Sequence, residues 1–237
     1  MKNRIAQVIS ICLLSFSTQS FSTSIADATM HVFVPTDVRT NILQKKLESV
    51  CPDFSITVFG RGQDFVSQSH KTHPDVILTL MPVIEKSSGY HSYFIGLKNG
   101  VTSEPYLLVS KDREINTTDL SNKTIGVLDL LGRKLMTEYV HQLLKQNVKV
   151  KRVTKREDLL PLLIFNAANA ILVSRSVFGA LSEKSQLNLV ATEMDVSIGL
   201  AALAANDDAV KDKLDKCIKK FDSHLNTMLG VDQWTKN

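Results

Sequence analysis

The feature that most constrains the fold of this chain is an alternation of strand and helix patterns that occurs twice. In the first half, apolar runs at 30–34, 54–59 and 76–78 are the strand patterns, and apolar residues at helical spacing over 38–50 predict a helix. After Asp119 the alternation begins again. Strands that alternate with helices form mostly parallel sheets flanked by helices. The sequence therefore predicts an α/β protein of two lobes.

The second half contains a strong amphipathic helix pattern at 131–144. Thr154 and Glu157 have capping-box spacing and predict a short helix, which starts later or kinks because of Pro161. The polar segment 68–74 predicts a surface loop. The remaining predicted elements are strands at 93–97, 106–109, 124–128, 148–153, 170–173 and 187–191, an apolar run at 198–204 and a C-terminal helix at 210–221.

The N-terminus has the pattern of a secretory signal peptide. Lys2 and Arg4 precede a mostly apolar stretch at 5–16, and Ala26-Asp27-Ala28 fits the cleavage rule. A membrane-spanning helix needs about 20 apolar residues, so this stretch is short for an uncleaved anchor, which is the alternative. We expect a mature chain exported to the periplasm and not embedded in the membrane.

The polar stretch 111–122 separates the two halves. We therefore expect a signal peptide at 1–28, lobe one from 29–112 plus 195–237, and lobe two from 113–194. The formal net charge of the whole chain is only +4, without a basic block. This charge argues against nucleic acid as a partner.

Two cysteines follow the predicted signal peptide, Cys51 and Cys217, and both lie in predicted helices. An oxidising compartment permits a disulfide between them. The alternative is two separate buried thiols, which behave as small apolar residues. We favour the disulfide.

Three stretches resemble the type II periplasmic solute-binding proteins of bacterial transport systems. They are 105–112, which looks like the strand leaving lobe one; 118–127, similar to the family's D-L-x-G-K-x-I-G-V; and 158–174, similar to its E-L-L-x-A-L helix and D-A-x-x-x-S strand. The stretch 198–201 resembles the return to lobe one. The resemblance leans toward the phosphonate-binding-like branch. It implies two lobes with a ligand cleft between them.

The chain departs from the family pattern at three places. Asn166 stands where the family has Gly, and Asn169 where it has Asp. Asn tolerates left-handed backbone, so the turn at Asn166 can be kept. The segment 129–133 replaces a loop that carries Gly, Ser or Thr in the family, which argues against a standard anion pocket.

Ligands of open parallel sheets bind beyond the carboxyl ends of the strands. In a two-lobed protein those ends face one cleft, and a ligand that touches both lobes stabilises the closed form. Loops after the predicted strands, and one aromatic residue, supply the candidate ligand-binding residues: Thr36, Asp37, Arg39, Arg61, Gln63, Thr79, Tyr106, Arg133, Ser174, Arg175 and Ser176.

Ser174 is the most informative candidate, because it follows a buried strand and precedes a predicted helix. Its hydroxyl and the free N–H groups there can hold an anion, and Arg175 or Arg133 can add a bidentate contact. The alternatives are a simple N-cap at Ser174 and a solvated charge at Arg175. Tyr106 either stacks on a ligand or fills the core.

No catalytic motif is present, so we expect a binding protein rather than an enzyme, with no cofactor and no metal. His70 and His73 are a histidine pair at a spacing that can bind zinc, but a zinc site needs a third ligand. The expected ligand is a small anionic solute. The expected partner of a monomeric chain is an inner-membrane permease or, alternatively, a membrane sensor such as a histidine kinase or a cyclic-dinucleotide enzyme. A ligand-free structural module of the envelope is a third possibility.

Overall fold

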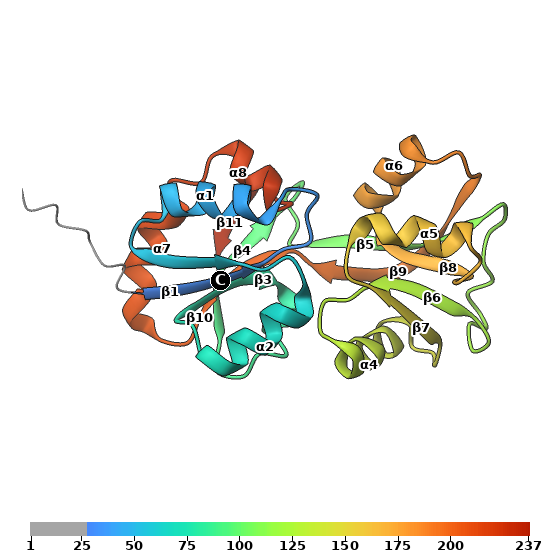
Figure 1. The fold of residues 1–237 in the computed structure, drawn as a ribbon, viewed down its shortest axis with the longest axis horizontal. Helices are drawn as coiled ribbons and strands as arrows, with labels where there is room; N and C mark the ends of the chain where they lie inside the picture. Colours follow the sequence, from blue (N-terminus) through green and yellow to red (C-terminus); the bar gives the residue numbers. More distant parts are fainter. Residues whose placement is uncertain (1–27) are drawn as a thin grey trace, which may run out of the picture.

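A computed structural model describes residues 28–237, and the predicted signal sequence up to Asp27 lies outside the described residues. The described chain forms two sheets, each flanked by helices, which lie side by side along the long axis of the molecule (Figure 1). Two long strands, β5 (Ser103–Lys111) and β9 (Leu189–Gly199), lead from one lobe to the other. The molecule is the two-lobed α/β protein that the sequence predicts.

Lobe one is built on a six-stranded sheet of order β11-β4-β10-β3-β1-β2. Strand β1 pairs parallel with β2 and β3. Strand β10 pairs antiparallel with β3, and β11 pairs antiparallel with β4. Its elements are β1 (Ala28–Phe33), α1 (Thr40–Val50), β2 (Phe54–Val58), α2 (Gly62–Thr72), β3 (Val76–Leu80), α3 (Met81–Ile84), β4 (His91–Leu97), β10 (Ala201–Ala205), η2 (Asp208–Val210), α7 (Lys211–Ile218), α8 (Ser223–Met228) and β11 (Gln233–Lys236).

Lobe two is built on a five-stranded sheet of order β7-β6-β8-β5-β9. Strands β6, β7 and β8 are parallel, and β5 pairs antiparallel with both β8 and β9. Its further elements are β6 (Thr124–Leu128), α4 (Arg133–Leu144), β7 (Lys149–Val153), η1 (Arg156–Asp158), α5 (Leu159–Ile164), β8 (Ala170–Ser174) and α6 (Arg175–Lys184).

Three details differ from the sequence-based expectation. Both sheets are mixed rather than mostly parallel, because β4, β10 and β11 add antiparallel pairs to the first sheet, and β5 and β9 add them to the second. The strand 103–111, expected in lobe one, belongs to the second sheet, and so does the whole of β9 up to Gly199. The segment 68–74, expected as a loop, is mostly the C-terminal part of α2.

The two Asn departures from the family pattern have clear backbone roles. Asn166 has φ +52°, a left-handed conformation that Gly adopts without strain and that Asn tolerates. The side-chain oxygen of Asn169 accepts a hydrogen bond of 2.8 Å from the backbone N–H of Thr124, the first residue of β6. The turn that leads into β8 is therefore kept.

One apolar cluster crosses the junction between the lobes. Phe65 and Ile77 of lobe one belong to the same buried cluster as Leu130, Leu131 and Met136 of lobe two. Two further clusters lie within single lobes, one between the first sheet and helices α1, α7 and α8, and one beneath α5. The lobes are consequently in direct apolar contact, in addition to their covalent connection through β5 and β9.

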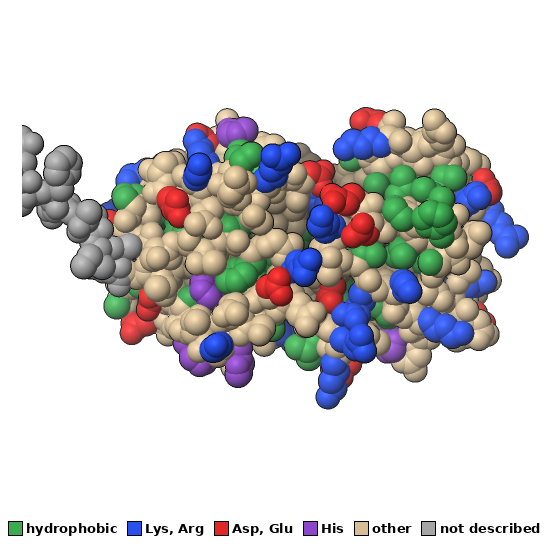
Figure 2. Space-filling model, viewed as in Figure 1, with side chains coloured by type: hydrophobic (Ala, Val, Ile, Leu, Met, Phe, Trp, Pro, Cys, Tyr) green, Lys and Arg blue, Asp and Glu red, His purple; other side chains and the backbone are tan. Residues whose placement is uncertain are grey.

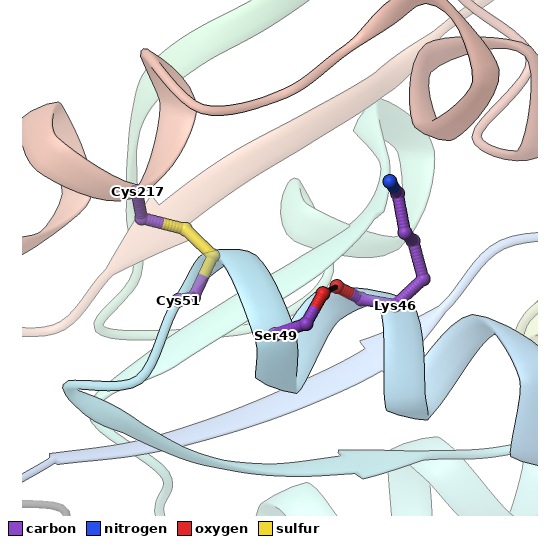
Figure 3. The surroundings of a disulfide bond; sticks show 4 residues. All are labelled: Lys46, Ser49, Cys51 and Cys217. Carbon is purple, nitrogen blue, oxygen red and sulfur yellow. Dashed lines mark hydrogen bonds between the residues drawn. A yellow bond between two sulfur atoms is a disulfide. The ribbon is translucent and has the colours of Figure 1, made fainter.

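A disulfide joins Cys51 and Cys217, with the two Cα atoms 4.8 Å apart. Figure 3 shows that it connects the end of α1 to α7. Both sulfur-bearing residues are buried in the core of lobe one. The disulfide therefore ties the first helix of this lobe to a helix that the chain adds only after lobe two is complete.

Candidate ligand cavity between the lobes

A cavity of about 250 Å³ lies between the two lobes. It is bordered by residues at or just beyond the carboxyl ends of four strands: Val34 and Pro35 after β1, Leu80 of β3, Val127 and Leu128 of β6, and Val173 and Ser174 of β8. This is the place where open α/β sheets bind ligands. The connecting strands and the end of α8 complete its wall.

An ion pair stands on the wall of the cavity where the chain passes between the lobes. Lys98 Nζ lies 3.2 Å from Glu104 Oε1, which also accepts a hydrogen bond of 3.2 Å from the backbone N–H of Ser176. Burial opposes the charge on Glu104, but the hydrogen bonds from Ser176 and the charge of Lys98 outweigh it and lower the pKa. Glu104 is therefore ionised and already paired at neutral pH.

Tyr106 contributes the second polar group of this wall. It is on β5 opposite Ser174 of β8, and it retains some accessible surface although it lies deep between the lobes. Burial raises its pKa to about 12, with a further increase from the charge of Glu104. Its hydroxyl keeps its proton at neutral pH and has no hydrogen-bond partner among the described residues.

Arg156 connects the two lobes at the edge of the cavity. It belongs to the turn η1 of lobe two, and its Nη2 donates a hydrogen bond to the carbonyl oxygen of Pro35 in lobe one. It also borders a larger outer groove of about 640 Å³. Figure 2 shows Lys, Arg, Asp and Glu side chains gathered along this junction. Arg156 thus has access to the cavity, the groove and both lobes.

The loop after β6 closes the junction beside the cavity. Asp129 is buried, its Oδ2 lies 2.5 Å from Arg152 Nη1, and its Oδ1 accepts a hydrogen bond from the N–H of Gly132. These bonds hold Leu130 and Leu131 in the interlobe cluster, each with only 4% of its surface exposed. This apolar loop stands at the segment where the sequence departs from the pattern that it otherwise resembles.

The predicted site residues divide into those that line the cavity and those that lie elsewhere. Tyr106, Ser174 and Ser176 line the cavity. The Ser174 hydroxyl accepts from the N–H of Val177 at 3.4 Å, so the N-cap role exists alongside any ligand role. Thr36, Asp37 and Arg39 border the outer groove together with residues 154–157 of lobe two.

The remaining candidates do not reach the cavity. Arg61 and Gln63 are exposed at the start of α2, and Arg133 is exposed as the first residue of α4. Arg175 is exposed, and its Nη2 donates to both carboxylate oxygens of Glu193, at 2.8 and 2.7 Å. The two arginines that were expected to bind an anion therefore point to other surroundings in this structure.

Sequence reasoning did not select Lys98, Glu104 or Arg156, which carry the charges of the cavity wall. Lys98 and Glu104 flank a tight turn, and Arg156 sits in a charged run before α5. Lys98 directly follows the predicted strand 93–97, whereas Glu104 and Arg156 do not directly follow a predicted strand. The available signals were the position of Lys98 at the end of that strand and the position of Glu104 two residues before the candidate Tyr106.

Thr79 is fully buried, and its hydroxyl is a buried polar group without a partner in the described residues. We expect Thr79→Val, which removes the hydroxyl at nearly constant shape, to raise the free energy of unfolding by about 1 kcal/mol. Urea unfolding measures this change, with Thr79→Ser as the control that keeps the hydroxyl. A loss of stability in Thr79→Val would show that the hydroxyl has a partner, such as a buried water.

No family model and no curated protein matches this chain. Solved structures do match. An amino acid ABC transporter substrate-binding protein, AbpA of Streptococcus pneumoniae bound to L-arginine, has a TM-score of 0.56 at 14% identity, over 86% of this chain and 92% of that one. The BvgS VFT2 domain of Bordetella pertussis has a TM-score of 0.55 at 11% identity, over 85% and 91%.

A third match is the substrate-binding protein of an amino acid ABC transporter, with a TM-score of 0.54 at 20% identity, covering 80% of this chain and 89% of that one. At these identities the likeness concerns the fold, and a fold by itself does not define a function. Within residues 28–237, no helix has the length and apolar character needed to cross a membrane. The chain has the two-lobed α/β fold of type II periplasmic binding proteins.

Proposed function

We propose that this chain captures a small solute between its two lobes and presents the closed form to a membrane protein. The observation that carries the proposal is the cavity at the carboxyl ends of β1, β3, β6 and β8, with polar groups on an otherwise apolar wall. Such a wall, with a few placed polar groups, is typical of small-molecule sites. The neighbours in fold are transporter binding proteins and a sensor domain.

Two sequence features support action in the periplasm. The predicted signal peptide directs export, and the Cys51–Cys217 disulfide persists in an oxidising compartment. We propose that the mature chain begins at Thr29 and acts as a monomer. The expected anionic ligand stays part of this proposal, with Arg156 as the cation instead of Arg133 or Arg175.

Thermal-shift screening of residues 29–237 tests the proposal. A ligand that binds only the folded state stabilises it by about 2.7 kcal/mol at a hundredfold excess over its dissociation constant. The screen covers phosphonates, phosphate, sulfonates, carboxylates, amino acids and signalling metabolites. We expect at least one class to raise the melting temperature in a dose-dependent manner.

A substitution that fills the cavity shows whether a hit occupies it. Val177 of α6 lines the cavity, whereas Leu181, one turn later on the same helix, does not. Val177→Trp is expected to abolish the shift, and Leu181→Trp to preserve it. A flat screen, or a hit that survives Val177→Trp, would count against a solute site between the lobes.

The alternative is a partner of a membrane sensor without a transport role, and one observation favours it. Leu130 and Leu131 join the lobes through direct apolar contact in the described chain. A lobe junction held by the protein's own apolar side chains suits a protein whose partner recognises its surface. Figure 2 shows hydrophobic side chains gathered on lobe two near α5, where Ile164 is 44% and Phe165 78% exposed. Permease and ATPase genes beside the coding gene would favour transport, and a lone sensor gene would favour signalling.

A further inference from the structure

We propose that the cavity takes a small monocarboxylate with an apolar body, and that Arg156 and Tyr106 bind its carboxylate group. This inference rests on the proposed function, because it names the class of solute that the interlobe cavity selects. It replaces the general expectation of an anion with one chemical type and two residues that were not expected to act together.

The apolar part of the inference comes from the wall of the cavity. Most lining side chains are aliphatic, among them Val34, Leu80, Val127, Leu130, Met136 and Leu172. An apolar cavity of about 150 Å³ is large enough for benzene, so about 250 Å³ admits a branched or aromatic body of moderate size. Phosphate and other strongly hydrated anions would lose their water without gaining enough donors on such a wall.

The charge of the ligand follows from which groups on the wall are already paired. Glu104 accepts from Lys98 and from the N–H of Ser176, so these two opposite charges compensate each other. An ammonium group would have to compete with Lys98 for the same carboxylate. Among the described residues, Arg156 has no carboxylate partner, and its only hydrogen bond goes to the Pro35 carbonyl. The uncompensated charge on the wall is therefore positive.

Tyr106 supplies the second donor. Tyr106 and Arg156 line the same cavity, and the charge of Arg156 counteracts part of the rise in the pKa of Tyr106. The phenol is protonated and without a partner, and a guanidinium has five N–H donors, of which one is used here. A carboxylate has two oxygens that accept charge-assisted hydrogen bonds from such donors. One carboxylate oxygen can accept a hydrogen bond from the Arg156 guanidinium while the other accepts one from the Tyr106 hydroxyl.

Isothermal titration of residues 29–237 with four probes of related skeleton tests the class. The probes are 4-methylpentanoate, the neutral 4-methylpentanamide, 3-methylbutylamine and leucine, with inorganic phosphate as the hydrated anion. We expect 4-methylpentanoate to bind at least tenfold more tightly than each of the others. Leucine is expected to bind more weakly because its ammonium group meets Glu104 already paired with Lys98. Tighter binding of leucine, the amine or phosphate would overturn the inference.

Two variants test the residues. Arg156→Gln should weaken 4-methylpentanoate binding at least tenfold and affect the amide much less. Tyr106→Phe, which leaves the interlobe contact of Arg156 intact, should weaken it about threefold to tenfold through the loss of one hydrogen bond. Arg175→Gln is the matched control, since Arg175 pairs with Glu193 outside the cavity, and should change nothing. Unchanged affinity in Tyr106→Phe would overturn the assignment even if Arg156→Gln fails to fold.

The failure of this inference is distinguishable from failure of the proposed function. If none of the four probes binds, the monocarboxylate assignment is wrong. If the broad screen still yields a solute whose binding Val177→Trp abolishes but Arg156→Gln leaves unchanged, the cavity remains a solute site of another class. If Val177→Trp leaves every hit unchanged, the proposed function itself fails.

Discussion

Loss of the Cys51–Cys217 disulfide is expected to lower the free energy of unfolding by about 3–5 kcal/mol. The bond joins residues 166 positions apart, so it closes a very long loop in the unfolded chain. In the chain-entropy account, the stabilisation grows with the logarithm of the loop length, and it is set against strain in the native state. The stabilisation expected from a loop that encloses the whole of lobe two is near the upper end of this range.

Urea unfolding of the oxidised protein and of the Cys51→Ser/Cys217→Ser double variant measures this loss. Two lobes need not unfold in one step, so the transition of each lobe is followed separately. Cys51 directly follows α1 and Cys217 lies in α7, both in lobe one, so the shift should fall on that lobe while lobe two changes little. A reductant should destabilise the oxidised protein and leave the double variant unaffected. Equal midpoints for the two proteins would refute a stabilising role for the bond.

The parts of the fold that depend on local pattern were predictable from the sequence. Strands such as β3 and β8 are short apolar runs, and α4 has apolar residues at helical spacing, so a window of a few residues contains the signal. Helix α2 was missed because its only buried side chain is Phe65, which leaves no periodic apolar face in a polar segment. The pairing of β5 with β9 was also missed, since it joins residues about eighty positions apart and has no local signature.

In the candidate site, too, residues with a local sequence signal were predictable and residues brought together only by the fold were not. Ser174 and Ser176 were selected because they follow a recognisable strand, and the structure brings them to the cavity with Tyr106. Lys98, Glu104 and Arg156 come from two separate segments, and only the folding of one lobe onto the other brings them to one wall. Arg133 and Arg175 also follow strands, but the direction of a long side chain cannot be read from its position in the sequence. Arg175 turns toward Glu193 instead.

Gly62→Ala is expected to separate the lobes, an effect that helix propensity alone would not produce. Gly62 is the first residue of α2 and does not have positive φ, so Ala is suited to its backbone. In isolation, alanine favours a helix by as much as about 1 kcal/mol over glycine. A Cβ atom at Gly62 would, however, lie only 2.7 Å from the carbonyl oxygens of Asp129 and Leu130 in lobe two.

These oxygens belong to backbone that cannot yield easily, because the buried Asp129–Arg152 ion pair holds the loop. Overpacking of this kind costs about 1–3 kcal/mol in the closed arrangement, whereas an open arrangement escapes the clash. The equilibrium should therefore shift toward open, with a larger radius of gyration in X-ray scattering and faster hydrogen exchange at residues 129–132.

Gly60→Ala is the matched control for this experiment. Its added Cβ atom would meet only the Thr40 methyl group, at an ordinary contact distance of 3.4 Å, and no atom of lobe two. It should leave the radius of gyration unchanged. If Gly62→Ala also leaves the radius and the exchange of 129–132 unchanged, the loop does not hold the lobes closed. The observation that favours the alternative, a sensor partner, would then lose its basis.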